Sequence, residues 1–389
     1  MKILITSDWY SPAVNGVVTS VKNLRRELEA MGHEVRILTL SQNRHSWEKD
    51  GVVYLGSVAA GLVYPGARLR TALAGKQVRE LVAWGPDVIH SQCEFSTFFL
   101  ARRIAGELGV PLVHTYHTVY EDYTHYFSPS VHFGKKAAAV FTRWAASHTD
   151  CLIAPTGKVR MLLQNYGVAK PVFVAPSGID LRRFQHEADP LRAAVLKASL
   201  HIPADRFVLA CVGRLAEEKN VEELLRFRAN LGPGYTLLLV GDGPDRKRLE
   251  GVAAGLGLEA PDVVFTGMIP AEQIADWYQL GDLFVSASTS ETQGLTYAEA
   301  LAAGVPVLCR ADPCLSGVVQ EGVNGWQYQD EGEFRKKLAI FQTQPHHWES
   351  FQKNARASAE EFSSVRFAER VEAIYLEQIQ RNALRRIPA

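Results

Sequence analysis

The most constraining feature of this sequence is a regular alternation between short apolar runs rich in Val, Ile and Leu and longer stretches with helical periodicity. Apolar runs of roughly four to eight residues are typical of parallel strands buried on both faces, and the helical stretches provide the crossovers that such strands need. The pattern therefore predicts an α/β fold. In the first half it predicts strands at Lys2–Ser7, Glu34–Thr39, Val88–His90, Leu112–Thr115, Cys151–Pro155 and Val172–Pro176.

A second series of strands follows, so the chain can build two separate sheets. Its 389 residues suffice for two domains, because domains commonly hold roughly 100 to 200 residues. The strand rhythm breaks near 180–205, where the sequence has Gly178, Pro190, Pro203 and a charged stretch. We predict a linker region at 180–205, between domains at 1–179 and 206–362. Residues 363–389 are predicted to form a closing helix that packs back on the first domain. The second series comprises Phe207–Gly213, Thr236–Gly241, Val263–Thr266, Leu283–Ser286 and Val305–Cys309.

Charge and cysteine content exclude several classes of protein. The 42 Lys and Arg residues balance 42 Asp and Glu residues, so we expect no nucleic-acid partner. Five cysteines without the close spacing of a zinc or redox motif fit reduced thiols in a cytoplasmic protein. Asp8 interrupts the first apolar stretch before a signal peptide can form, and no run reaches the roughly 18 apolar residues of a membrane span. Any membrane contact is therefore expected to be peripheral.

Glycine and basic residues follow the first strand of each series, at the end of the strand where open parallel sheets bind ligands. Gly16 precedes a helix, so a phosphate could bind its N–H. The alternative is that this glycine only forms the turn between strand and helix that is common in α/β proteins. Arg214 and Lys219 follow the first strand of the second series. A guanidinium fork and an ammonium suit a diphosphate whose negative charge grows as a bond breaks. The alternative is a solvated loop in which Lys219 pairs with Glu217 or Glu218.

The most specific stretch is the turn at Gly294 with the helix that follows it. The first helical N–H groups belong to Leu295 and Thr296. Two carboxylates, those of Glu291 and Glu299, are eight residues apart across this turn. Carboxylate oxygens accept strong hydrogen bonds from sugar hydroxyls, which indicates a sugar-binding site. The alternative is that Glu299 caps its helix and Glu291 is solvated.

The Glu291-x7-Glu299 spacing resembles the signature of the retaining glycosyltransferases of family 4. This resemblance implies the GT-B fold, in which two Rossmann-like doubly wound domains face a central cleft, and an enzyme that transfers a hexose from a UDP-sugar. It covers nearly the whole chain, including the stretches Asp8–Gly16, Gly213–Asn220, Gly241–Pro244 and Glu291–Glu299.

Within this family, the stretches 114–123 and 286–297 are most similar to those of the enzymes that glucosylate diacylglycerol. The chain has Thr292-Gln293 where many family members have Pro-Phe, a departure that the diacylglycerol glucosyltransferases share. The resemblance implies transfer of glucose from UDP-glucose to 1,2-diacylglycerol, with retention, on the inner face of the cell membrane. Alternatives are a family 4 enzyme with another donor or acceptor, such as a glycolipid or a soluble phosphate-bearing acceptor, and a non-catalytic nucleotide-sugar-binding protein.

The resemblance also assigns roles to individual residues. It places Glu299 on the ribose hydroxyls, Glu291 on the donor sugar, and Arg214 with Lys219 on the pyrophosphate. His117 matches the histidine that the family places beside the donor sugar and the reacting centre. The residues expected to border the phosphates or the base are Gly16, Met268, Ile269, Gly294, Leu295 and Thr296.

We expect no metal and no other cofactor. The Asp-x-Asp motif that holds a divalent ion in the other large class of glycosyltransferases is absent, so basic side chains must neutralise the diphosphate. His114 and His117 are not expected to form a metal pair, because on a strand they point to opposite faces. The chain also lacks the Gly-x-Gly-x-x-Gly, P-loop and Gly-x-Ser-x-Gly motifs of other enzyme classes.

Two predicted helices, at 68–84 and 135–144, combine an apolar arc with a basic arc, which suits contact with an anionic lipid surface. They lie in the half of the chain where 19 Lys and Arg residues outnumber 13 Asp and Glu residues. The alternative is that both helices pack on their own sheet. Because an acceptor with two acyl chains must be met at a bilayer, the resemblance favours an anionic membrane as a partner. The basic residues are Arg68, Lys76, Arg79, Lys135, Lys136 and Arg143.

Overall fold

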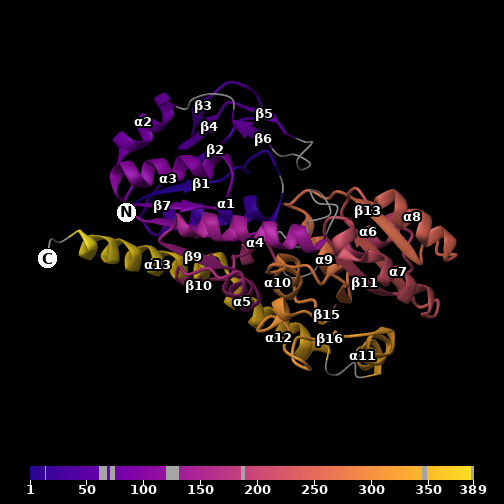
Figure 1. The fold of residues 1–389 in the computed structure, drawn as a ribbon. Helices are drawn as coiled ribbons and strands as arrows, with labels where there is room; N and C mark the ends of the chain where they lie inside the picture. Colours follow the sequence, from indigo (N-terminus) through magenta and orange to yellow (C-terminus); the bar gives the residue numbers. More distant parts are fainter. Residues whose placement is uncertain are drawn as a thin grey trace. The chain divides into compact units, whose positions relative to one another are not determined.

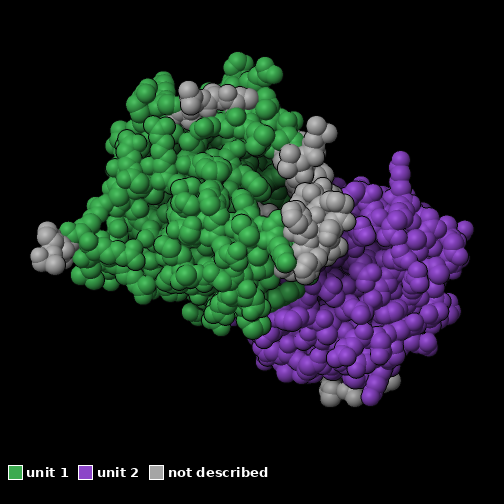
Figure 2. Space-filling model, in the orientation of Figure 1, with its two compact units in different colours: residues 1–178, 364–389 green, residues 179–363 purple. Residues whose placement is uncertain are grey.

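The chain folds into two compact units, each with its own largely parallel sheet (Figure 1, Figure 2). Unit 1 consists of residues 1–178 and 364–389, and unit 2 consists of residues 179–363. The structure is a computed structural model, and it describes residues 1–13, 15–60, 68–70, 75–119, 131–184, 189–343 and 348–386.

The eight-stranded sheet of unit 1 is parallel except for its last pair of strands. Its strands in spatial order are β10 (Val172–Val174), β9 (Cys151–Ala154), β8 (Leu112–Thr115), β7 (Val88–Ser91), β1 (Lys2–Thr6), β2 (Glu34–Leu40), β4 (Val52–Leu55) and β3 (Trp47–Lys49). The direction in which the chain adds strands reverses between β1 and β7, which makes this pair the switch point of the sheet. A separate antiparallel pair is formed by β5 (Ser57–Ala59) and β6 (Arg68–Arg70).

Helices cover both faces of this sheet because successive strand residues point to opposite sides. Ile3 and Ile5 of β1 pack in one core with α1 and α13, whereas Leu4 packs in another core with α2 and α3. The last helix of the chain therefore completes the first unit. The helices of unit 1 are α1 (Gly16–Ala30), α2 (Gly75–Trp84), α3 (Ser96–Leu108), α4 (Val131–Ser147), α5 (Gly157–Asn165) and α13 (Ser364–Arg385).

Unit 2 contains a six-stranded sheet that is parallel throughout. Its strands in spatial order are β13 (Val263–Gly267), β12 (Tyr235–Val240), β11 (Phe207–Val212), β14 (Leu283–Ser286), β15 (Val307–Arg310) and β16 (Gly325–Tyr328). Alternate residues of β12 enter different cores, so this sheet is also covered on both faces. Its switch point lies between β11 and β14.

The helices of unit 2 lie before, between and after these strands, and four of the α-helices connect successive strands of the sheet. Its longer helices are α6 (Pro190–Ser199), α7 (Val221–Ala229), α8 (Arg246–Gly255), α9 (Ile274–Gln279), α10 (Leu295–Ala302), α11 (Glu331–Thr343) and α12 (Trp348–Ala359). Its short 3₁₀ turns are η2 (Leu181–Arg183), η3 (Glu217–Lys219), η4 (Pro313–Leu315) and η6 (Glu360–Phe362).

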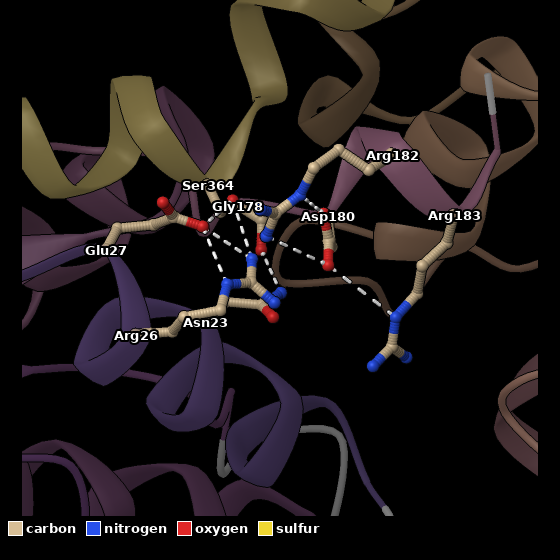
Figure 3. A network of polar contacts seen from close by, with 8 residues as sticks. All are labelled: Asn23, Arg26, Glu27, Gly178, Asp180, Arg182, Arg183 and Ser364. Carbon is tan, nitrogen blue, oxygen red and sulfur yellow. Dashed lines mark hydrogen bonds and ion pairs between the residues drawn. The ribbon is translucent and has the colours of Figure 1, made fainter. Parts of the chain in front are cut away.

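Helix α1 holds both ends of unit 1 at which the chain passes to unit 2 (Figure 3). The side-chain amide of Asn23 donates to the carbonyl of Gly178 at 2.9 Å. The hydroxyl of Ser364 donates to the carboxylate of Glu27 at 2.8 Å. Since one rigid helix binds both residues, the two ends of this unit are fixed relative to its sheet.

All eleven strands predicted from the apolar runs are present, with ends that differ by at most two residues. The missed strands are short: β3, β4, β5, β6 and β16 have three or four residues each. In β3 every residue is exposed, so no apolar run marks this edge strand in the sequence. The two doubly wound α/β units confirm the predicted fold class.

Two predicted segments differ from the structure. Residues 180–205 do not form a free linker: Leu181, Phe184 and Ile202 are buried in a core of unit 2, and the chain passes between units at 178/179 and 363/364 instead. The predicted helix at 68–84 begins only at Gly75 in the described ranges, because Arg68–Arg70 pairs as β6 with β5. None of the described helices combines the length and the apolar character needed to cross a bilayer.

Candidate active site

The predicted donor-site residues of unit 2 lie on loops at the switch point of its sheet. Arg214 and Lys219 follow β11, and Glu291 follows β14, which is hydrogen-bonded to β11. After two such neighbouring strands the chain continues to opposite faces of the sheet, so the loops that follow the two strands border one crevice. The topology therefore brings the basic loop and the carboxylate loop together.

Lys219 and Glu291 are in direct contact although 72 residues separate them in the sequence. The Lys219 ammonium donates to Glu291 Oε1 at 2.5 Å, and Arg214 pairs with Glu218. The hydroxyl of Ser290 donates to the carbonyl of Glu218 at 3.1 Å, which ties the two loops together. Lys219 therefore pairs with Glu291 and not with Glu217 or Glu218, the alternative that the sequence left open. Both cations are held at the site by carboxylates.

Gly294 allows the loop after β14 to turn sharply into α10. Its φ of +71° lies in the left-handed region, and a Cβ built there would come within 2.3 Å of the ring of Tyr297. Leu295 and Thr296 are the first two residues of α10, so their N–H groups have no acceptor within the helix. Such N–H groups at a helix N-terminus are suited to bind the oxygens of a phosphate.

Glu299 lies one turn inside α10 and does not cap this helix. Its carboxylate accepts a hydrogen bond of 2.7 Å from the hydroxyl of Tyr278 on α9. Burial raises the pKa of Glu299 to about 7, against the opposing effects of the Tyr278 hydrogen bond and of the charge on Arg183. This carboxyl group therefore changes its charge near neutral pH, and it can accept hydrogen bonds from ligand hydroxyls once ionised.

Met268 and Ile269 follow β13 at the same edge of the sheet. The side chain of Met268 is 69% exposed, while Ile269 is partly buried against a core of unit 2. Gly267 immediately before them has a φ of +78°, so the backbone turns at the end of the strand. An exposed methionine next to a partly buried isoleucine provides an apolar surface on which a flat base can pack.

The two remaining predicted residues, Gly16 and His117, belong to unit 1. Gly16 is the first residue of α1, and the side chain of Asn15 caps this helix by accepting from Val18 N. His117 follows β8, and its Nε2 lies 2.6 Å from Oε1 of Gln92 in the loop after β7. Burial lowers the pKa of His117 to about 4, so its imidazole is neutral at physiological pH.

His117 belongs to a polar cluster at the switch point of the sheet of unit 1. Asp8, which follows β1, accepts a hydrogen bond from Thr97 N at 2.8 Å, and burial raises its pKa to about 6. His114 Nε2 lies 3.1 Å from Glu94 Oε1. The two histidines thus have different partners, and within the described ranges no three His, Cys, Asp or Glu side chains are arranged to hold a metal ion.

Sequence reasoning missed three residues of these sites: Gln92, Arg183 and Tyr278. Gln92 directly follows a predicted strand, so the rule that ligands bind beyond the carboxyl ends of strands could have drawn attention to it. Tyr278, 21 residues before Glu299, donates a hydrogen bond to its carboxylate. Arg183, 116 residues before Glu299, lowers the pKa of this carboxyl group through its charge. No sequence motif marks these two, because only the folded core brings them to Glu299.

Two doubly wound α/β units, with a Glu-x7-Glu loop and two basic residues at the switch point of the second, define a GT-B glycosyltransferase. Residues 14–183 match the Glycosyltransferase Family 4 domain, and residues 194–358 match the domain called Glycosyl transferases group 1. The chain belongs to glycosyltransferase family 4.

The chain is similar over 98% of its length to two relatives that have the same enzyme name. It is 33% identical to the alpha-monoglucosyldiacylglycerol synthase of Acholeplasma laidlawii, over 98% of both chains. It is 33% identical to the alpha-monoglucosyldiacylglycerol synthase of Streptococcus pneumoniae, over 98% of this chain and 87% of the relative. Its fold is similar to that of HepE from Anabaena in complex with UDP-glucose, with a TM-score of 0.75, 20% identity, and coverage of 97% and 100% of the two chains.

Proposed function

We propose that this enzyme transfers glucose from UDP-glucose to the free hydroxyl of 1,2-diacylglycerol, with retention of the α configuration. The observation that carries the proposal is the similarity to two alpha-monoglucosyldiacylglycerol synthases over 98% of the chain. The proposed donor agrees with the pairing of basic residues and carboxylates at the switch point of unit 2. The proposed site of action is the inner face of the cell membrane.

In the proposed reaction, unit 2 stabilises the departing UDP. Lys219 and Arg214 neutralise the charge that grows on the diphosphate, together with the N–H groups of Leu295 and Thr296. Glu299 accepts hydrogen bonds from the ribose hydroxyls, and Glu291 binds the sugar. The acceptor hydroxyl attacks the same face of the sugar from which UDP leaves, and a phosphate oxygen takes its proton. Retention follows from attack on this face.

The proposed chemistry uses no metal ion. Two fixed cations and helix N–H groups supply the positive charge that a divalent ion provides in enzymes with a carboxylate-held metal. We therefore expect an excess of EDTA to leave the rate of UDP release unchanged. A rate that falls with EDTA and returns with magnesium would contradict metal-independent transfer.

An exposed aromatic surface of unit 1 supports membrane contact. Phe95 and Phe99 at the start of α3 are 48% and 53% exposed, and Val140 on α4 is 56% exposed. Phe141 stacks on Phe95 at 5.7 Å between ring centroids, and Trp144 contacts Phe99 at 5.5 Å. We name these five residues the α3–α4 aromatic surface. Such a surface suits the boundary between headgroups and acyl chains.

Basic residues adjoin the α3–α4 aromatic surface. Lys135 and Lys136 are exposed on α4, and the guanidinium of Arg102 lies 5.4 Å from the ring of Trp144. By contrast, Val78 and Leu81 of α2 are buried in the core of unit 1. Of the two predicted membrane helices, α4 therefore agrees better with contact to an anionic leaflet, and α2 with packing on its own sheet.

Replacing Phe95 and Phe99 together by serine is expected to weaken binding to vesicles that contain anionic phospholipid by at least about tenfold. Full burial of one phenylalanine contributes roughly 1.5–3 kcal/mol, and about half of each ring is already covered by the protein. Cosedimentation with vesicles measures the change. Replacing Lys135 and Lys136 by serine is expected to weaken the same binding, with a larger effect at low salt.

The matched control replaces Leu191 and Val195, two exposed apolar residues of α6 in unit 2, by serine. This double variant removes two apolar side chains that are more exposed than Phe95 and Phe99, and it is expected to bind vesicles like the original enzyme. Equal cosedimentation of the phenylalanine variant and the original enzyme would show that the α3–α4 aromatic surface does not enter the membrane.

The proposed activity is tested by measuring UDP release with vesicles that contain diacylglycerol, comparing UDP-glucose with UDP-galactose. We expect turnover with UDP-glucose and a product whose anomeric proton has the coupling of an α-glucoside by NMR. Turnover only with a glycolipid or a soluble phosphate-bearing acceptor would assign another acceptor within the family. Tight UDP binding without turnover of any donor would indicate a non-catalytic binding protein.

A further inference from the structure

A chain of hydrogen bonds in unit 1 links His117 to the last helix of the protein. His117 Nε2 lies 2.6 Å from Gln92 Oε1, and Gln92 Nε2 lies 3.1 Å from His90 Nε2. His90 Nδ1 lies 2.6 Å from the hydroxyl of Tyr375 on α13. Gln92, His90 and Tyr375 are each at least 98% buried. Because water does not reach such buried groups, it cannot replace their hydrogen-bonding partners, and each group keeps one role as donor or acceptor.

The amide of Gln92 fixes the direction of this chain. Its oxygen only accepts and its NH₂ only donates, so His117 must carry its proton on Nε2 while His90 Nε2 accepts. The hydroxyl of Thr115 lies 2.7 Å from the same nitrogen of His90 and can donate to it as well. The proton of His90 is then on Nδ1 and faces the hydroxyl of Tyr375.

The surroundings of His117 disfavour its charged form. Burial is the largest cause of its lowered pKa, the neighbouring His114 of β8 lowers the pKa further, and Glu94 in the loop after β7 opposes both. His90 of β7 is buried as well, and its pKa is lowered well below the ordinary value. Tyr375 of α13 contacts the cluster through His90. A neutral amide at Gln92 therefore orients His117 without adding the negative charge that would protonate it.

We infer that Gln92 is a positioning residue, which holds His117 in the tautomer that carries its proton on Nε2 and leaves the lone pair of Nδ1 for a hydroxyl of the donor sugar. Among the described residues, the hydrogen bond of the His117 ring is made through Nε2, and Nδ1 makes none. This inference rests on the proposed function and on the position beside the donor sugar that the family resemblance implies for His117. A neutral acceptor suits that place, because a charged imidazolium would repel the positive charge that develops on the sugar as UDP leaves.

The test replaces Gln92 by glutamate and by leucine. A carboxylate at 92 keeps the acceptor but adds a negative charge, which is expected to raise the pKa of His117 by one to three units. At saturating UDP-glucose, kcat of the original enzyme is expected to stay level between pH 8 and pH 6. The kcat of Gln92→Glu is expected to fall over this range, by about tenfold where the rise in the pKa of His117 from about 4 reaches three units. Gln92→Leu loses the orienting group, so its kcat is expected to be about tenfold lower at both pH values.

The matched control is Thr115→Val, which removes a hydrogen bond to His90 but none to His117. Its kcat and pH profile are expected to follow those of the original enzyme within threefold. Thermal unfolding of each variant shows whether a lower rate reflects a damaged fold. If Gln92→Glu and Gln92→Leu both retain the kcat and the pH profile of the original enzyme, Gln92 does not position His117.

The tautomer itself is measured without substrate by ¹H–¹⁵N NMR of the histidine rings, with His117→Gln to assign the signals. We expect a protonated Nε2 and an unprotonated Nδ1 for His117 in the original enzyme. A proton on Nδ1 would overturn the inference even if the enzyme glucosylates diacylglycerol. Conversely, the expected tautomer in a protein without glucosyltransferase activity would preserve the assignment of the hydrogen bonds and overturn the proposed function alone.

Discussion

Replacing Lys219 by alanine is expected to lower kcat/KM for UDP-glucose by at least about 10²-fold. Removing one electrostatic donor at a reacting centre commonly costs about 2.7–4 kcal/mol of transition-state stabilisation. Lys219 is only 29% exposed and is held by Glu291 at 2.5 Å, so its charge is fixed in place before the donor arrives. The change is measured by UDP release with diacylglycerol vesicles over a range of UDP-glucose concentrations.

A double-mutant cycle separates the action of Lys219 on the diphosphate from its contact with Glu291. If Lys219 only orients Glu291, then Lys219→Ala combined with Glu291→Gln loses no more rate than Glu291→Gln alone. If Lys219 also neutralises the departing UDP, we expect the double variant to be at least about tenfold slower than Glu291→Gln. This second outcome is the one that the proposed function requires.

The control for charge removal is Arg226→Ala. Arg226 lies on α7 of the same unit, is 65% exposed and pairs with Glu222, so its loss removes one cation without reaching the loops after β11 and β14. Its rate is expected to stay within twofold of the original enzyme, because exposed ion pairs contribute little. A Lys219→Ala variant that performs as well as Arg226→Ala would remove Lys219 from the site.

The strands of both sheets could be predicted because burial on two faces demands continuous apolar sequence. β12, for example, reads Tyr-Thr-Leu-Leu-Leu-Val, and five of these six residues are buried. The edge strand β3 could not be predicted, since one exposed strand of three residues needs no apolar pattern. The predicted start of the helix at 68–84 was wrong for a related reason. A helical wheel considers only the helix itself, whereas Arg68 forms hydrogen bonds to the backbone of Ser41 and Gln42, which are distant in the sequence.

The candidate site likewise has features that the sequence predicts and features that it does not. The positions of Arg214, Lys219 and Glu291 could be predicted because each lies in the segment after a strand, and the switch-point rule places such segments at one crevice. Which residue pairs with which could not be predicted. Glu218 was a candidate partner of Lys219 by proximity in sequence, but it pairs with Arg214, and Glu291 reaches Lys219 from the neighbouring strand. Pairings across strands depend on side-chain packing that no local pattern contains.

Glu299→Ala is expected to lower kcat/KM for UDP-glucose by at least about 10²-fold. Two hydrogen bonds from ribose hydroxyls to a charged acceptor contribute roughly 1.5–3 kcal/mol each, and both are lost with the carboxylate. Steady-state UDP release measures the loss. The change should appear largely in KM, because the ribose is bound before and during the transfer.

The ionisation of Glu299 also predicts how donor binding depends on pH. With a pKa of about 7, the carboxyl group is roughly nine-tenths ionised at pH 8 and one-tenth ionised at pH 6. Since hydroxyl donors bind the ionised form, the Kd of UDP-glucose measured by calorimetry without acceptor is expected to rise about tenfold from pH 8 to pH 6. Because about half of the Glu299 carboxyl groups carry a proton at pH 7, binding at this pH should release about half a proton per UDP-glucose.

Two variants at this contact distinguish ionisation from simple packing. Glu299→Gln keeps the size of the side chain and an acceptor for Tyr278, but it does not ionise, so its weaker binding should no longer depend on pH. Tyr278→Phe removes the hydrogen bond that favours the carboxylate, so the pKa of Glu299 rises and the weakening of binding begins at a higher pH. If the original enzyme binds UDP-glucose equally well at pH 6 and pH 8, its donor is not held by an ionised Glu299.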